Sequence, residues 1–201
     1  MMNTVYRPAA VPEIPLKEVL RYSGMTVCTD DSLLKKALDI AAACRSCAKG
    51  GIVFQKLTVA ECNGDSVSFE GFLTLKGSLV SRYLSDCRYA ILVLATAGHE
   101  VDRFIASRGV ISSLDGLLAD ASGNALVEAM LDDFCNTVLH NENIKPRISP
   151  GYGDFHLENQ IEILRYLDAH RNVGVCLNDS LLMSPSKSVS ALIGIRKDSH
   201  V

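Results

Sequence analysis

The segment Arg147-Ile-Ser-Pro-Gly-Tyr152 combines residue types that are suited to holding a small charged ligand. The guanidinium of Arg147 presents a planar fork of donors that matches a carboxylate. Gly151 allows the backbone to approach a ligand closely, and Tyr152 offers a flat ring with a polar tip. These residues favour binding of a zwitterionic molecule with an aromatic ring rather than bond-breaking. From residue types alone, an ordinary surface turn is the alternative.

Glu128 is the most informative single charge. On a helical projection it shares a stripe with Ala121 and Ala125, so we expect it to face inward. A buried carboxylate needs a cation or several hydrogen-bond donors. Glu128 is therefore expected to form an internal salt bridge or to receive an ammonium or sulfonium group from a ligand, unless this side of the helix is more solvated than the projection indicates.

A thiol-redox or metal site is a further possibility, based on Cys44-Arg-Ser-Cys47. The two cysteines lie one turn apart inside an expected helix, whereas redox pairs usually lie at a helix N-terminus and structural zinc requires four ligands. We therefore favour two small packed residues. Asp168-Ala-His170 approaches a corrinoid-binding signature, but its glycine falls one position late, at Gly174, so no cobalt ligand is expected.

Catalytic motifs are not found. The chain has no Gly-x-x-x-x-Gly-Lys phosphate loop, no Gly-x-Gly-x-x-Gly after a strand and no Gly-x-Ser-x-Gly elbow. We predict no catalytic and no metal-ligating residues, which favours a binding or activating module.

Composition limits the class of protein. The 201 residues are 48% hydrophobic and 21% charged, with a net charge of −3, which fits one folded unit and argues against a nucleic-acid partner. No apolar span reaches about 20 residues, so no membrane helix is expected. Seven scattered cysteines and the absence of a signal-like N-terminus predict reduced thiols in a cytoplasmic protein.

The expected elements indicate an α+β fold with a mostly antiparallel sheet and a central helix. Helices are predicted over 18–22, 31–49, from 99 onward, over 114–139 and over 155–171. Strands are predicted over 51–59, 66–74, 88–95 and 189–195. Asn63-Gly64-Asp65 predicts a hairpin turn, and Leu157, Ile161, Leu164 and Leu167 form the expected buried stripe of the last helix.

Further motifs accompany the arginine segment in a fixed order. Downstream of it stand Gly174-Val-Cys-Leu177-Asn-Asp-Ser180, Met183, Pro185 and Ser188-Val-Ser190, and upstream Asp120-Ala-Ser-Gly123 leads to Glu128-Ala129. In this order they resemble the activation domain of cobalamin-dependent methionine synthase, whose arginine motif has the form Arg-Pro-Ala-Pro-Gly-Tyr. The resemblance is carried by residues 91–201. Residues 1–90, an expected helical and hairpin part, match only in general character.

The resemblance implies that residues 1–201 form a single unit with a bent, mostly antiparallel sheet and packed helices in a C-shape. It implies S-adenosylmethionine as the ligand, with Arg147 on the ligand carboxylate and Glu128 balancing its positive charge. Ser149 would contribute its backbone, Gly151 would permit close approach, and Tyr152 would contact the ligand through its ring or hydroxyl.

The same resemblance implies partners. Cobalamin would come only through a partner protein, a cobalamin-dependent methionine synthase or another corrinoid protein, and an electron donor such as flavodoxin or ferredoxin would supply the electron. The chain would support reductive methylation of the cobalt in trans.

Some positions depart from the family pattern. A second acidic residue, expected six positions before the arginine, is Asn141, with Glu142 beside it. Gly153-Asp154-Phe155-His156 replaces Pro-Ala-Cys-Pro, and the residues end at Val201, before a strand that carries a further aromatic contact in the family. These departures leave a second interpretation open, a non-catalytic corrinoid-associated binding or regulatory module with an altered ligand.

Overall fold

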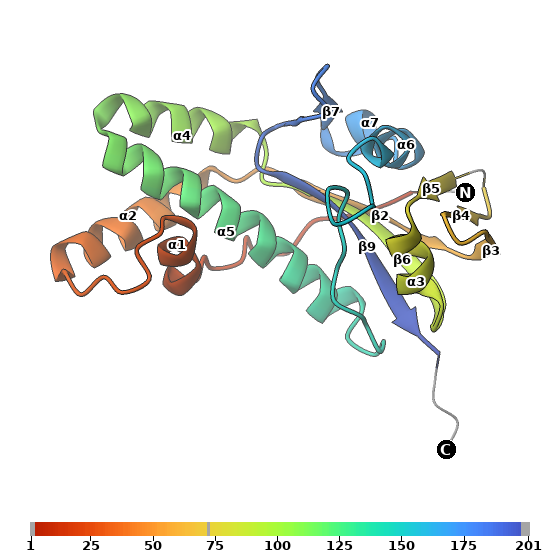
Figure 1. The fold of residues 1–201 in the computed structure, drawn as a ribbon. Helices are drawn as coiled ribbons and strands as arrows, with labels where there is room; N and C mark the ends of the chain where they lie inside the picture. The colour runs from red at the N-terminus through yellow and green to blue at the C-terminus, as the bar shows by residue number, and fades with distance from the viewer. Residues whose placement is uncertain (1–2, 72, 198–201) are drawn as a thin grey trace.

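The computed structural model describes residues 3–71 and 73–197, which form an α+β fold built on antiparallel sheets (Figure 1). The main sheet has the order β1-β2-β6-β9, and each neighbouring pair is antiparallel. Its strands are β1 (Thr4–Tyr6), β2 (Gly51–Leu57), β6 (Cys87–Thr96) and β9 (Ser188–Arg196). The predicted fold class is confirmed.

Both faces of strand β9 are covered, whereas alternation in the sequence predicts a half-buried strand. Leu192 belongs to one core cluster together with Ile163. Ile193 belongs to another cluster, together with Phe134 of the long helix. The prediction of one exposed face is therefore wrong, because helices pack against both sides of the sheet.

Four helices pack together beside the sheet (Figure 1). They are α1 (Leu16–Tyr22), α2 (Asp31–Cys47), α4 (His99–Ile111) and α5 (Ser113–Val138). Helix α5 contacts the other three, and the hydroxyl of Ser112 caps it by accepting from the backbone N–H of Asp115. The long central helix predicted over 114–139 is thus confirmed. No helix within 3–71 and 73–197 is both long and apolar enough to cross a membrane.

Two small sheets lie outside the main one. They contain β3 (Val59–Cys62), β4 (Ser66–Phe69) and β5 (Leu73–Lys76), and β7 (Cys176–Leu177) with β8 (Met183–Ser184). The turn predicted at residues 63–65 is present, and Gly64 there has a φ of +82°. It joins β4 to β3 rather than to the strand predicted over 51–59, because that strand ends at Leu57 and the chain continues as β3. The single strand predicted over 66–74 is wrong, because the chain turns at Gly71 (φ +91°) and returns as β5.

The helix predicted over 155–171 is also wrong as a single element. It is divided into α6 (Asn159–Tyr166) and α7 (Ala169–Val173), because Asp168 takes a left-handed conformation with a φ of +45°. Ile161, expected in the buried stripe, is 48% exposed. A short helix that the sequence did not predict, α3 (Ser78–Leu84), packs near β6 and is important for the site below.

Candidate functional site

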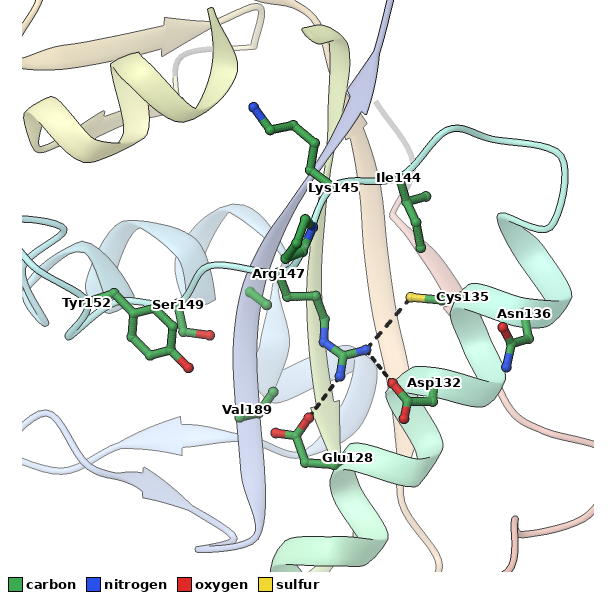
Figure 2. Close-up of a pocket in the computed structure, with 12 residues that line it drawn as sticks. Glu128, Asp132, Cys135, Asn136, Ile144, Lys145, Arg147, Ser149, Tyr152 and Val189 are labelled. Carbon is green, nitrogen blue, oxygen red and sulfur yellow. Dashed lines mark hydrogen bonds and ion pairs between the residues drawn. The ribbon is translucent and has the colours of Figure 1, made fainter. Parts of the chain in front are cut away.

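A cavity of about 690 Å³ lies between α5, β9 and the segment 144–152 (Figure 2). Its lining residues come from these three elements: Glu128, Asp132, Cys135 and Asn136; Ile144, Lys145, Pro146, Arg147, Ser149 and Tyr152; and Val189 and Ala191. Ligand cavities in proteins usually measure about 300–1,000 Å³. The structure therefore brings four of the five predicted ligand residues to one cavity of suitable size.

Helix α5 supplies the acidic wall of this cavity. Glu128, Asp132 and Cys135 recur at helical spacing, so their side chains lie on one face. Glu128 alone was predicted from the sequence, although Asp132 lies one helical turn after it and shares its face. The expectation that Glu128 faces the core is wrong. Its side chain is 36% exposed because this face of α5 borders the cavity.

Arg147 bridges both carboxylates of that wall (Figure 2). Its Nη2 donates to Glu128 Oε2 at 2.9 Å, and its Nη1 donates to Asp132 Oδ1 at 2.8 Å. Nη1 also lies 3.9 Å from the Sγ of Cys135. The internal salt bridge that the sequence left open for Glu128 is therefore formed, and Arg147 is its partner.

The electrostatics keep Arg147 charged. Burial acts to lower the pKa of Arg147, but the hydrogen bond that Arg147 donates to Asp132 and the charges of both carboxylates outweigh this effect, so the pKa is raised. Burial raises the pKa of the Cys135 thiol, while the adjacent guanidinium opposes that rise. Cys135 is therefore a neutral wall of the cavity rather than a thiolate nucleophile.

The backbone of the arginine segment is held along the edge of β9. The Lys145 N–H donates to the Gly194 carbonyl at 2.8 Å. Ile148 and Leu192 exchange two hydrogen bonds, at 3.1 and 2.8 Å. Arg147 thus projects from a nearly strand-like segment that is hydrogen-bonded to β9 both before and after Arg147.

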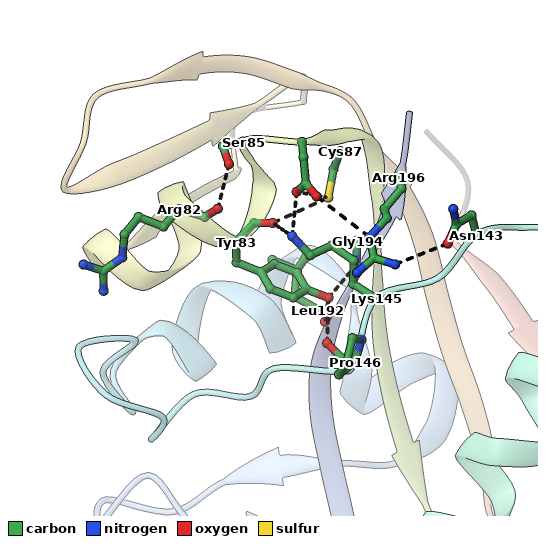
Figure 3. Close-up of polar contacts among 11 residues, drawn as sticks. Arg82, Tyr83, Ser85, Cys87, Asn143, Lys145, Pro146, Leu192, Gly194 and Arg196 are labelled. Carbon is green, nitrogen blue, oxygen red and sulfur yellow. Dashed lines mark hydrogen bonds and ion pairs between the residues drawn. The ribbon is translucent and has the colours of Figure 1, made fainter. Parts of the chain in front are cut away.

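Tyr83 of α3 reinforces this attachment (Figure 3). Its hydroxyl donates to the Pro146 carbonyl at 2.8 Å and accepts from the Gly194 N–H at 2.8 Å. Burial raises the pKa of Tyr83 to about 12, so the hydroxyl stays protonated and remains a donor. The Lys145 ammonium donates to Asp86 Oδ1 and to the Tyr83 carbonyl, both at 2.6 Å. Sequence reasoning missed Tyr83 because nothing local links it to a segment so far along the chain.

The turn after Arg147 requires glycine for its conformation. Gly151 has a φ of +101°, and a Cβ at this position would meet no atom within 4 Å. Gly151 does not line the cavity, so in this structure it shapes the turn rather than making room. Tyr152, the next residue, is 57% exposed, and Figure 2 shows its ring on the opposite side of Arg147 from α5.

Asp154 fastens the far end of this turn to α3. Its carboxylate accepts from the Ser78 N–H at 2.9 Å, the Ser78 hydroxyl at 2.6 Å and the Leu79 N–H at 2.9 Å. The Ser78 hydroxyl and these backbone donors lower the pKa of Asp154 to about 2. Gly77 lets the two segments meet, because a Cβ there would lie 2.4 Å from the Asp154 carbonyl oxygen. Asp154 thus has a structural role in this chain, holding the turn after Tyr152 against α3.

The expected second acid lies elsewhere. Asn141 and Glu142 do not line the cavity, and Glu142 pairs with Arg88 at 3.7 Å. Asp132 provides the second carboxylate beside Arg147 instead.

The other cysteine and histidine candidates do not form a site. Cys44 is buried within α2, and burial raises its pKa to about 12, so it is a protonated thiol at neutral pH. Cys47 is half-buried at the end of the same helix, not at its N-terminus. His170 is exposed on α7. Within the part of the chain that the structure describes, no three His, Cys, Asp or Glu residues are grouped to hold a metal.

Comparison with known proteins identifies a fold and no family. No protein-family model matches the chain, and no curated protein matches it by sequence. The fold is similar to that of the crystal structure described as the MetH reactivation domain bound to AdoHcy, with a TM-score of 0.70. The match covers 100% of this chain and 80% of the other, at 14% sequence identity. The fold-level resemblance predicted from the motifs is confirmed.

Proposed function

We propose that the cavity binds S-adenosylmethionine and that the chain presents this ligand to the cobalamin of a partner corrinoid protein. The observation that carries the proposal is the convergence of Arg147, Glu128 and Tyr152 on one cavity. The fold is also similar to a domain described as bound to AdoHcy, the demethylated form of the same ligand.

The charged groups of the cavity fit the charged groups of the ligand. Arg147 offers two N–H donors to a carboxylate, and a ligand carboxylate would take over donors now used by Glu128 and Asp132. The released carboxylates would then face the ligand ammonium and sulfonium. Binding would exchange an internal set of ion pairs for one shared with the ligand, so little charge would be left uncompensated.

Ser149 and Tyr152 complete the proposed contacts. Ser149 lines the cavity directly before Pro150 and Gly151, where its backbone can face a ligand. Tyr152 has an exposed ring and hydroxyl at the edge of the cavity, available for stacking or a hydrogen bond. Gly151 would act through the conformation of the turn that places both residues.

Cobalamin would be supplied by the partner, a cobalamin-dependent methionine synthase or another corrinoid protein. In reductive methylation, the partner's inert cob(II)alamin would receive one electron from a donor such as flavodoxin or ferredoxin and the methyl group of the sulfonium ligand, which would leave as S-adenosylhomocysteine. The contribution of this chain would be to orient the ligand, and positioning alone supplies several kcal/mol of rate enhancement, up to about 7–11 kcal/mol in favourable cases.

A second candidate function is a corrinoid-associated binding or regulatory module with a different cationic ligand. It is favoured by the replacement of the expected acid at 141 and by the engagement of Glu142 with Arg88. The cavity would then use Asp132 to hold a ligand other than S-adenosylmethionine.

Isothermal titration with S-adenosylmethionine tests the proposal. The wild-type chain should bind, and Arg147→Ala should weaken binding by at least about tenfold, as expected for loss of a charged hydrogen bond. Arg165→Ala is the matched control, because Arg165 forms an exposed ion pair with Glu162 on α6, outside the cavity. Absence of binding by the wild type at millimolar ligand would refute the proposal. Binding of another cationic nucleoside or amino acid in its place would favour the second candidate.

A further inference from the structure

Asp132 is the acidic residue of the cavity to which the sequence motifs assign no role. It lies one helical turn after Glu128, and its Oδ1 accepts from Arg147 Nη1 at 2.8 Å. Its side chain is 64% exposed, and Figure 2 shows it directed toward the guanidinium. Arg147 therefore holds two carboxylates with a single positive charge.

The cavity as a whole has an excess of negative charge. Glu128 and Asp132 oppose only Arg147, because the ammonium of Lys145 is engaged by Asp86 and by the Tyr83 carbonyl. Figure 2 shows the Lys145 side chain leading away from Arg147 and from α5. The cavity therefore has two carboxylates and one available cation. A ligand with one positive and one negative charge would leave one of these carboxylates without a cation.

The excess continues into an adjoining cavity of about 500 Å³ between α1 and α5. This cavity shares Glu128, Asp132 and Asn136 with the first. It adds the carboxylates of Glu13, Glu18 and Asp133, with Arg21 as the added cation. Among the described residues that line this second cavity, Arg21 is the one cation, and it is engaged by Glu18 at 2.7 Å.

We propose that Asp132 makes the site selective for a ligand with a net positive charge, and thus for the sulfonium S-adenosylmethionine over the neutral thioether S-adenosylhomocysteine. This inference rests on the proposed function. When the carboxylate of S-adenosylmethionine binds Arg147, Glu128 and Asp132 lose their cation. The ammonium of the ligand then neutralises one of these two carboxylates, and the sulfonium neutralises the other. S-adenosylhomocysteine lacks the second cation, so one carboxylate stays uncompensated. Transfer of the methyl group would therefore lower the affinity of the site for S-adenosylhomocysteine and favour its replacement by a new molecule of S-adenosylmethionine.

The test compares the two ligands in the wild type and in Asp132→Asn by isothermal titration. Asparagine keeps the size and one acceptor oxygen but removes the charge. Asp39→Asn is the matched control, because Asp39 is exposed on α2, outside the residues that line the two cavities. Thermal unfolding of each variant checks that the fold is retained.

The wild type should bind S-adenosylmethionine more tightly than S-adenosylhomocysteine. Asp132→Asn should reduce that preference about two- to fivefold, the range expected for one solvent-exposed charge pair. The loss should fall mainly on S-adenosylmethionine, and Asp39→Asn should leave the ratio unchanged. Equal weakening of both ligands by Asp132→Asn, or no wild-type preference, would overturn the inference while leaving the proposed function intact. Failure of the wild type to bind either ligand would overturn both.

Discussion

The guanidinium of Arg147 lies 2.9 Å from the carboxylate of Glu128, so the central cation of the cavity and one of its anions neutralise each other. The two residues come from different elements, the segment after α5 and α5 itself. A ligand that uses either group has to replace this contact. The affinity of the site is therefore the difference between two sets of ion pairs, and it is sensitive to the charge of each member.

Replacing Glu128 with Gln should weaken S-adenosylmethionine binding. The amide keeps the shape and an acceptor for Arg147 but removes one charge that would face the ligand ammonium or sulfonium. Because the side chain is partly exposed, we expect a loss of about three- to tenfold, measured by titration calorimetry. Glu162→Gln, an exposed carboxylate on α6, is the control. Unchanged affinity in Glu128→Gln would remove Glu128 from the proposed site.

Tyr83→Phe should lower both stability and ligand affinity, although Tyr83 does not line the cavity. The change leaves the Gly194 N–H and the Pro146 carbonyl without their shared partner. The Pro146 carbonyl is exposed and can bind water, but Gly194 is buried, and loss of the partner of its N–H costs about 1–3 kcal/mol, measurable by urea denaturation.

Affinity should fall in Tyr83→Phe because Pro146, the residue before Arg147, loses its hydrogen bond to the Tyr83 hydroxyl and is held less firmly. Tyr166→Phe is the control, since the Tyr166 hydroxyl makes an exposed bond of 3.3 Å to the Glu70 carbonyl. A stability loss with unaltered affinity would show that Tyr83 supports the fold and does not position Arg147.

Local periodicity predicted the elements that are regular over many residues. Helix α5 and strand β6 extend without interruption, and their apolar patterns identify them. Two errors in the bounds of the elements fall where a single residue takes a left-handed conformation. Gly71 breaks a predicted strand and Asp168 breaks a predicted helix, and alternation or helical spacing continues through both.

The candidate site was predictable where its residues form short motifs. The arginine segment and Glu128 carried a recognisable pattern, and the cavity brings them together. Tyr83 and Asp154 were not predictable, because each acts across a long sequence separation on a backbone group or a helix end. Such contacts depend on tertiary packing, and no fixed spacing in the sequence identifies the residues that will make them.

Gly151→Ala should disturb ligand binding through the backbone. Alanine at a φ of +101° is strained, although its Cβ would meet no neighbour. We expect a cost of about 1–2 kcal/mol in unfolding free energy and a clear loss of S-adenosylmethionine affinity as the turn shifts. Gly64→Ala is a matched control, since Gly64 has a φ of +82° and equally free space in the β3–β4 turn. Similar loss of affinity in both variants would mean that the effect is general destabilisation.

The cysteines should differ in reactivity toward iodoacetamide under native conditions. Cys62 and Cys176 are exposed and should be modified first. Cys44 should resist modification, because burial raises its pKa to about 12 and limits access. Mass spectrometry of peptides from a time course gives the order. Modification of Cys44 as fast as Cys62 would revive the thiol-redox interpretation of Cys44 and Cys47.

Asp154→Asn should lower the Tm of the protein by a few degrees near neutral pH. This is the size expected when a helix, here α3, loses a charged side chain that accepts from its first N–H groups. The pKa of Asp154 is lowered to about 2, below the value of about 3.9 for an unfolded chain. A carboxylate with a lowered pKa contributes stability above the unfolded value and loses that contribution as pH falls through the folded one.

The stability difference between wild type and Asp154→Asn should therefore be largest at pH 5–7 and should shrink progressively between about pH 4 and 2. Urea denaturation followed by circular dichroism at several pH values measures it, with Asp39→Asn as the control for charge. A difference that stays constant down to pH 2.5 would show that hydrogen-bond geometry, rather than the charge of the carboxylate, holds the turn after Tyr152 against α3. In that case the difference in ligand affinity between wild type and Asp154→Asn would also stay constant across this pH range, because the turn would be placed independently of ionisation.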